Sequence, residues 1–122
     1  MPKCVLIVED NQHLRQILAS ILRFAGYDIL EAETGTQAIE KAVSAKPNLI
    51  LMDLDLPDIT GIAAAKAIKR SSTTACIPII ACSAWSGSQL RDEALNAGMV
   101  DYLQKPIATE VIKAKIKEFI GP

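Results

Sequence analysis

Short apolar runs alternate with longer amphipathic runs along the whole chain. Several of the short runs are continuously apolar and rich in β-branched residues, which is typical of parallel strands that are buried on both faces. They are Cys4–Val8, Tyr27–Ala32, Leu49–Met52, Ile77–Cys82 and Val100–Leu103. Between them apolar residues recur with the helical period. Strands that alternate with helices predict βαβ units, and therefore an α/β fold with a parallel sheet covered by helices on both faces.

Polar residues and glycines mark several of the predicted helix ends. Gly26 follows the first helical stripe, at the place where that helix should stop. Two pairs of residues have the spacing of a capping box, in which a hydroxyl side chain opens the helix. These pairs are Thr34 with Gln37 and Ser86 with Gln89.

The length and composition of the chain indicate a single domain. The 122 residues are 50% hydrophobic, enough for one core without disulfides or a structural metal, so we expect a single domain over residues 1–122. The formal net charge of −1 gives no basic footprint for nucleic acid. The N-terminal apolar run, Cys4–Val8, is too short for a signal peptide or a membrane span. We expect a soluble, cytoplasmic protein.

The three cysteines have neither C-x-x-C spacing nor a paired histidine, which disfavours a disulfide scaffold or a zinc site. Cys4, Cys76 and Cys82 lie in apolar, strand-like runs. We interpret all three as reduced core residues, as in a cytoplasmic protein.

Residues whose side chains could take part in chemistry follow four of the five predicted strands. Glu9 and Asp10 follow the first strand, Asp53 the third, Ser83 the fourth and Lys105 the fifth. Each alone has an ordinary structural explanation as a turn former, a helix cap or a solvated lysine. In an open parallel sheet, however, ligands bind beyond the carboxyl ends of the strands. These side chains are therefore expected to converge on one edge.

Such a group has a coherent chemistry. Two close carboxylates repel each other by roughly 4 kcal/mol at an effective dielectric constant near 20. A hard divalent cation such as Mg²⁺ would offset that repulsion and would also bind phosphate oxygens. A carboxylate is a competent nucleophile that forms an acyl phosphate. A lysine can offset the charge of the phosphoryl group, and a serine hydroxyl can donate a hydrogen bond to it.

With these residues in view, the chain resembles the receiver domain of two-component response regulators over essentially all 122 residues. The matching segments are V-L-I-V-E-D-N (5–11), L-I-L-M-D-L-D-L-P-D-I-T-G (49–61), P-I-I-A-C-S-A (78–84) and D-Y-L-Q-K-P (101–106). The resemblance implies a flavodoxin-like, doubly wound sheet of five parallel strands in the order 2-1-3-4-5, flanked by five helices. It also implies a signalling switch activated by phosphorylation.

The resemblance implies a role for each residue of the acidic group. Glu9, Asp10 and Asp53 would bind Mg²⁺, or Mn²⁺ in its place, together with the backbone carbonyl of Asp55. Asp53 would accept the phosphoryl group from a phosphohistidine of a sensor histidine kinase or of a histidine phosphotransfer protein. The reaction would be stoichiometric, so the chain would not be a turnover enzyme.

Further residues would report the state of the site. By the same resemblance Ser83 would swing toward the phosphoryl group, Lys105 would contact it and Tyr102 would change rotamer. The output surface would consist of the fourth helix, fifth strand and fifth helix. The resemblance names no particular downstream effector protein, and we expect no direct contact with nucleic acid or membrane. The peptide bond before Pro106 would be cis.

Other positions have structural explanations or depart from the family pattern. Pro57 and Gly61 are typical of a turn into the third helix. His13 is interpreted as a helix residue without a chemical role, because the donor histidine belongs to the partner. Asp55 is more often apolar or an amide in the family, and Trp85 is unusually bulky for this place. Our hypothesis is that these two side chains set access to the site and the lifetime of the acyl phosphate; the alternative is that both merely lie on the rim.

Two other functions are compatible with parts of the sequence. Asp53-Leu54-Asp55 is a D-x-D at a strand end, as in haloacid-dehalogenase-like phosphatases. There, however, the motif normally ends the first strand, and here no acidic pair follows a later strand to replace their metal ligands. A receiver-like interaction module that accepts no phosphate is the other alternative, and the full set of acceptor-site residue types argues against it. The chain ends soon after the fifth helix, so we expect a stand-alone regulator or an excised receiver without an output domain.

Overall fold

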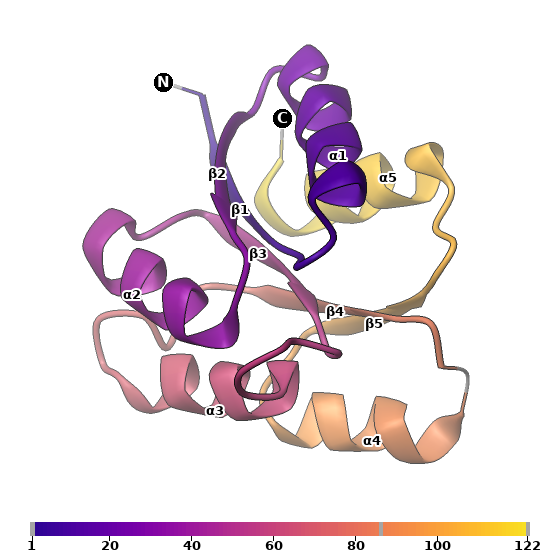
Figure 1. Cartoon of the computed structure of the whole chain (residues 1–122). Coiled ribbons are helices and arrows are strands. Elements are labelled where there is room, and N and C mark those ends of the chain that lie inside the picture. The colour runs from indigo at the N-terminus through magenta and orange to yellow at the C-terminus, as the bar shows by residue number, and fades with distance from the viewer. Residues whose placement is uncertain (1, 86, 122) are drawn as a thin grey trace.

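The computed structural model of the protein describes residues 2–85 and 87–121. Its strands form one parallel sheet, hydrogen-bonded in the order β2-β1-β3-β4-β5 (Figure 1). The strands are β1 (Cys4–Val8), β2 (Asp28–Ala32), β3 (Leu49–Asp53), β4 (Ile79–Ser83) and β5 (Asp101–Gln104). The α/β fold and the strand order 2-1-3-4-5 are therefore confirmed.

A helix follows each strand, and the helices cover both faces of the sheet. They are α1 (Gln12–Phe24), α2 (Gly35–Ala45), α3 (Gly61–Arg70), α4 (Ser88–Asn96) and α5 (Thr109–Ile120). In Figure 1, α1 and α5 lie on one side of the sheet and α2, α3 and α4 on the other. Successive strand side chains point to opposite faces. Leu6 and Val8 accordingly join the core beneath α2, α3 and α4, whereas Val5 and Ile7 join the core beneath α1 and α5.

The central strands are buried along their whole length. All five residues of β3 and all five of β4 are buried. This explains why these segments are apolar without alternation, since neither face of the strand meets water. Chain order along the sheet reverses between β1 and β3, so the loops after these two strands diverge and leave a crevice at their carboxyl ends.

One of the two predicted capping boxes is confirmed in part. Thr34 is the N-cap of α2, and its hydroxyl oxygen accepts a hydrogen bond of 3.1 Å from the backbone N–H of Gln37. The other prediction falls on Ser86, which lies outside the described residues. α4 begins after Gly87, which has no side chain with which to cap it.

Strand boundaries differ from the prediction by one or two residues. Ile77 lies before β4, because its N–H donates to the carbonyl oxygen of Thr74 in a turn, at 3.1 Å, and Pro78 has no N–H to give to a strand. Tyr27 likewise precedes β2, although it is buried. Its hydroxyl donates to the carbonyl oxygen of Gly121 at 3.1 Å and so ties the end of the chain to the sheet.

The prediction that all three cysteines are core residues is wrong for one of them. Cys82 in β4 is buried and Cys4 in β1 is partly buried, but Cys76 is exposed. The apolar run that contains Cys76 is shared between a turn and a strand, and Cys76 lies in the turn. Among the described residues, no helix combines the length and apolar character needed to cross a membrane.

Candidate functional site

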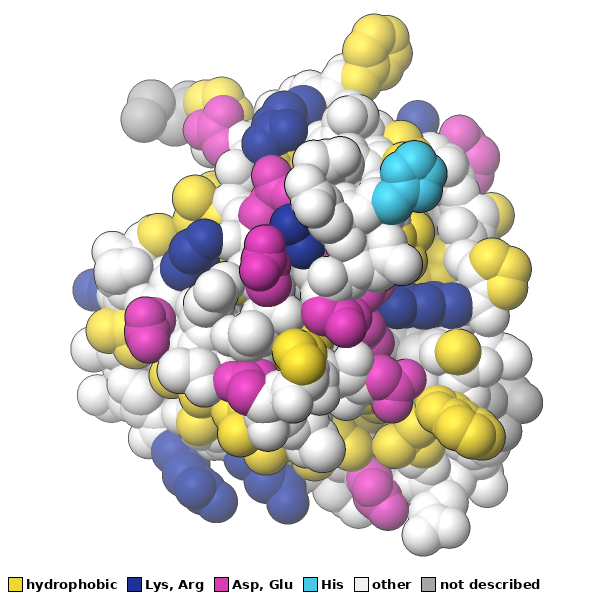
Figure 2. Space-filling view, viewed as in Figure 1, with side chains coloured by type: hydrophobic (Ala, Val, Ile, Leu, Met, Phe, Trp, Pro, Cys, Tyr) yellow, Lys and Arg dark blue, Asp and Glu magenta, His cyan; other side chains and the backbone are white. Residues whose placement is uncertain are grey.

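Two carboxylates are buried side by side at the carboxyl edge of the sheet. Asp53 is the last residue of β3 and Glu9 directly follows β1, whose Val8 is paired with Met52 of β3. The two acidic residues are each only 4% exposed. Parallel register therefore holds two negative side chains next to each other, as the sequence predicted. Figure 2 shows acidic side chains gathered near the middle of this face, beside basic ones.

Asp10 completes a group of three carboxylates. One carboxylate oxygen from each of Glu9, Asp10 and Asp53 lies within 4.8 Å of the others. Asp10 is exposed, so one side of the group faces solvent while the other is buried. The donors are hard oxygen atoms, and the open side leaves room for water or phosphate oxygens. This donor set fits Mg²⁺, which prefers a few carboxylates and retains several waters.

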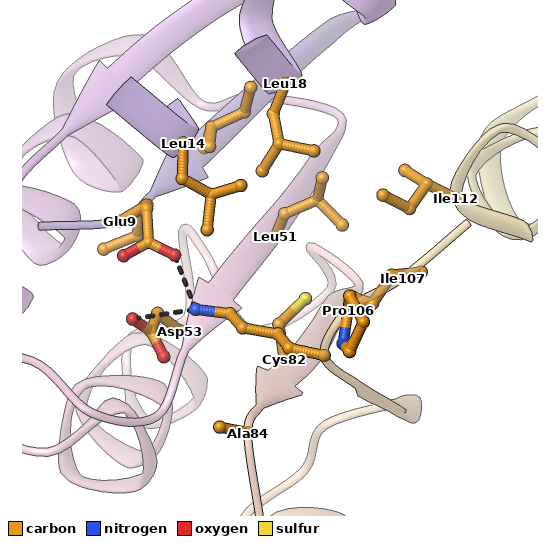
Figure 3. Close-up of a pocket in the computed structure, with 13 residues that line it drawn as sticks. Glu9, Leu14, Leu18, Leu51, Asp53, Cys82, Ala84, Pro106, Ile107 and Ile112 are labelled. Atoms are coloured by element: carbon orange, nitrogen blue, oxygen red, sulfur yellow. Dashed lines mark hydrogen bonds and ion pairs between the residues drawn. The ribbon is translucent and has the colours of Figure 1, made fainter. Parts of the chain in front are cut away.

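The ammonium group of Lys105 lies between the two buried carboxylates (Figure 3). Its Nζ is 2.6 Å from Oε1 of Glu9 and 3.3 Å from Oδ2 of Asp53. Burial lowers the pKa of Lys105, but the hydrogen bond to Glu9 and the charges of Asp53 and Glu9 outweigh burial, so its pKa is raised. Lys105 therefore stays protonated at neutral pH. The peptide bond from Lys105 to Pro106 is cis, as the resemblance implied.

The loop after β3 contacts the carboxylate of Asp53. The backbone N–H of Asp55 donates to Oδ1 of Asp53 at 3.1 Å, and the side chain of Asp55 is exposed. Pro57 is exposed at a bend in this loop, and Gly61 begins α3. A Cβ on Gly61 would lie 2.3 Å from the carbonyl oxygen of Asp53, so only glycine permits this return of the chain to the strand end.

Ser83, Trp85 and Tyr102 are linked by hydrogen bonds beside the site. Ser83 ends β4 and is fully buried, and its hydroxyl oxygen accepts from the backbone N–H of Trp85 at 3.1 Å. The carbonyl oxygen of Trp85 accepts a hydrogen bond from the hydroxyl of Tyr102 in β5. The indole side chain of Trp85 itself is 67% exposed. The serine at the site thus connects, through one loop residue, to the edge strand of the sheet.

Residues 5–117 of the sequence match the family described as the response regulator receiver domain. The chain belongs to this family. It is 39% identical over 115 residues to the phosphate regulon transcriptional regulatory protein PhoB of Pseudomonas aeruginosa. That match covers 94% of the chain and 50% of PhoB, so the chain spans about half the length of this relative. It is 31% identical over 121 residues to the polar-differentiation response regulator DivK of Brucella anthropi, covering 99% of the chain and 98% of DivK.

Solved structures agree with this assignment. The receiver domain of the sensor histidine kinase PA1611 of Pseudomonas aeruginosa PAO1, whose structure has a magnesium ion coordinated in the active-site cleft, superposes with a TM-score of 0.91. The two are 32% identical, and the match covers 100% of each chain. Receiver domains are phosphoacceptors that bind Mg²⁺ and take phosphoryl groups from histidine kinases or phosphotransfer proteins. The chain is accordingly a signalling switch activated by phosphorylation, and this membership disfavours the phosphatase alternative.

An apolar cavity of about 430 Å³ adjoins the acidic group of this receiver domain. Leu14 and Leu18 of α1 and Leu51 of β3 line it, and Glu9, Asp53 and Lys105 form its polar end (Figure 3). Cys82 also lines the cavity. Burial raises the pKa of the Cys82 thiol to about 12, so the thiol stays protonated and unreactive beside the carboxylate of Asp53.

Sequence reasoning missed the buried guanidinium group of Arg15. This side chain of α1 is 7% exposed, and its Nη1 donates to the backbone carbonyl oxygen of Glu9 at 2.8 Å. Its Nε donates to Glu31 at 3.1 Å and its Nη2 to Glu33 at 3.2 Å. Arg15 thereby supports the residue that follows β1. The acidic partners lie 16 and 18 residues away in sequence, so no local pattern pointed to them. His13 lies on α1, the first helix, and is exposed.

Proposed function

We propose that Asp53 is the phosphoryl acceptor, in a Mg²⁺-dependent reaction with a phosphohistidine of a sensor histidine kinase or a histidine phosphotransfer protein. The observation that carries the proposal is the surroundings of Asp53. It is a buried carboxylate with an ammonium group 3.3 Å from Oδ2 and two further carboxylates within 4.8 Å. A carboxylate nucleophile, a fixed positive charge and oxygen ligands for a metal ion thus lie together at one place.

The chemistry of transfer is simple. A lone pair of the Asp53 carboxylate forms a bond to phosphorus, while the bond between phosphorus and the imidazole nitrogen of the partner breaks. The bonding electrons return to the imidazole, and Asp53 becomes an acyl phosphate. Lys105 stays protonated and would contact the phosphoryl oxygens, which carry the developing charge.

Glu9, Asp10, Asp53 and the backbone carbonyl of Asp55 would hold the metal ion. When bound, Mg²⁺ would neutralise phosphoryl oxygens and help to align donor and acceptor. Mn²⁺, which also prefers oxygen ligands, would substitute for it. The reaction is stoichiometric, so the domain is a switch with, at most, slow loss of its own phosphoryl group.

Output would depend on the hydrogen bonds that link Ser83 to Tyr102. If Ser83 turns toward the phosphoryl group, its hydroxyl leaves the N–H of Trp85. The loop that accepts the hydrogen bond of Tyr102 is then free to move, and Tyr102 with it. Tyr102 lies in β5, between α4 and α5, so the α4-β5-α5 surface would change on phosphorylation. Phosphorylation needs to favour one arrangement by only a few kcal/mol.

A comparison of two small phosphodonors tests this proposal. Phosphoramidate contains the same phosphorus–nitrogen bond as phosphohistidine, whereas an aryl phosphate contains a phosphorus–oxygen bond with a good leaving group. With Mg²⁺ and phosphoramidate we expect one phosphoryl group per chain, and none after chelation with EDTA. With the aryl phosphate we expect no continuing release of phenol. Many turnovers would instead favour the phosphatase, and no labelling by any donor would favour the interaction module.

A further inference from the structure

The loop between β3 and α3 is joined to the start of α2 by one side chain, Asp58. Its Oδ1 accepts from the backbone N–H of Gly35 at 2.8 Å. Its Oδ2 accepts from both the N–H and the hydroxyl of Thr36, at 2.9 and 2.5 Å. The hydroxyl of Thr36 is the main cause that holds the pKa of Asp58 well below its usual value. Asp58 is therefore ionised at neutral pH and engaged by three donors.

Direct packing reinforces this contact. A Cβ on Gly35 would lie 2.4 Å from Cγ1 and 3.3 Å from the carbonyl oxygen of Ile59, the residue after Asp58. The backbone at the start of α2 therefore lies against the loop, with no room for a side chain between them. Glycine at position 35 permits this approach.

The backbone hydrogen bonds of the loop hold its base, and the side chains of Leu56 and Ile59 pack against the core. The N–H of Leu54 donates to the carbonyl oxygen of Cys82 at 3.0 Å, and the N–H of Gly61 donates to the carbonyl oxygen of Leu54 at 3.1 Å. Asp55 lies between this base and Asp58, and its N–H donates to Asp53. The path of the backbone through Asp55 is thus fixed at one end by the sheet. Beyond Asp55 it is held by the packing of Leu56 and by the hydrogen bonds of Asp58 to the start of α2.

We propose that Asp58 is a positioning residue for the metal site, because it fixes the backbone carbonyl of Asp55 by joining the loop to α2. This inference rests on the proposed function, in which that carbonyl is a metal ligand. Groups that orient a metal ligand without touching the metal commonly change metal affinity by 10- to 100-fold.

A purely structural role is the alternative to exclude. Asp58 adds acceptors for the first N–H groups of α2, which alone would stabilise that helix. Thr34 already caps the same helix end through its bond with Gln37. Thr34 is outside the loop that carries Asp55. Thr34→Ala is therefore a matched control that weakens the same helix end without releasing the loop.

The test is a Mg²⁺ titration of the whole chain followed by backbone-amide NMR shifts, with thermal unfolding measured on the same samples. Asp58→Ala should weaken Mg²⁺ affinity about tenfold. Asp58→Asn, which keeps one acceptor oxygen, should have an intermediate affinity for Mg²⁺. This milder variant still tests the proposal if Asp58→Ala does not fold. Thr34→Ala should lower the melting temperature while its dissociation constant for Mg²⁺ stays within about twofold of wild type.

Two failures can be told apart. If wild type binds Mg²⁺ with shifts centred on Glu9, Asp10 and Asp53, but both Asp58 variants bind equally well, the positioning role is wrong and the proposed site survives. The same holds if Thr34→Ala weakens Mg²⁺ binding as much as Asp58→Ala does. If wild type shows no saturable shifts around these residues, the metal site is wrong and the inference falls with it.

Discussion

The candidate site has a buried floor and an exposed rim, and different parts of the chain hold them in place. The floor consists of Glu9, Asp53 and Ser83, which end or directly follow strands and are at most 4% exposed. The rim consists of Asp10, Asp55 and Trp85, which lie in loops and are exposed. Hydrogen bonding between strands sets the positions of the floor residues. The rim residues depend on loop contacts such as those of Asp58.

The difference separates two kinds of effect. A floor residue meets the reacting group in a dry, fixed environment, where one charge or hydrogen bond counts for more than in water. A rim residue is screened by solvent, so a lost charge there has a small effect. Substitutions in or beneath the floor should decide whether the chemistry and the fold survive, and substitutions on the rim should adjust rates.

The largest effect short of removing the acceptor is expected from Lys105→Met. The variant keeps an unbranched side chain out to Cε but removes the ammonium group that lies 2.6 Å from Glu9 and 3.3 Å from Asp53. Labelling of Asp53 by acetyl phosphate should slow by about a hundredfold, because the phosphoryl oxygens lose a fixed positive partner in the transition state. The rate is measured by time-resolved mass spectrometry of the intact chain.

Lys113→Met provides the control for that loss of charge. Lys113 lies on α5, and its ammonium group makes a 3.6 Å contact with the exposed Glu110. The Lys113→Met variant should be labelled by acetyl phosphate at the same rate as wild type. Equal rates for Lys105→Met and wild type would show that the floor needs no fixed cation.

The contribution of Arg15 to the floor of the site is tested by measuring the free energy of unfolding. Arg15→Met removes the buried donor to the carbonyl oxygen of Glu9, so that this oxygen loses a hydrogen bond inside the protein. We expect a loss of about 2 kcal/mol in the free energy of unfolding, measured with urea. Arg23→Met removes an exposed guanidinium group, 3.6 Å from Glu31, and should cost less than about 0.5 kcal/mol. Similar losses for the two variants would contradict the distinction between buried support and surface charge.

The smallest effects are expected on the rim. Asp55→Ala and Trp85→Ala should each change the half-life of the acyl phosphate by roughly two- to fivefold, as expected when an exposed interaction worth under about 1 kcal/mol is lost. The final extent of labelling should stay that of wild type. The half-life is measured after removal of excess acetyl phosphate, the phosphodonor. Unchanged half-lives in both variants would mean that these side chains merely lie on the rim.

The floor was predictable from sequence because its positions follow from the strands. Continuous apolar runs revealed the strands, since both faces of β3 and β4 are buried. Asp53 stood out as an acidic residue at the end of such a run, and the topology rule for parallel sheets brought Glu9 and Lys105 to the same edge. The resemblance to receiver domains then supplied the roles and the cis peptide bond before Pro106.

What supports the site was not predictable, because it depends on pairs that are distant in sequence. Asp58 lies 22 and 23 residues from its partners Thr36 and Gly35, and in the segment D-I-T-G it had the appearance of an ordinary turn residue. Arg15 was one polar residue of an amphipathic helix until Glu31 and Glu33 were placed beside it. The wrong prediction that Cys76 is a core residue has a related cause. An apolar run alone does not show where a turn ends and a strand begins.

The most direct test of the central claim is the mass of the intact chain after exposure to Mg²⁺ and acetyl phosphate. Wild type should gain one phosphoryl group, and Asp92→Asn, which changes an exposed aspartate of α4, should gain one as well. Asp53→Asn should gain none, and EDTA should prevent the gain in wild type. A phosphoryl group on Asp53→Asn, or none on wild type, would contradict the assignment of Asp53 as the acceptor.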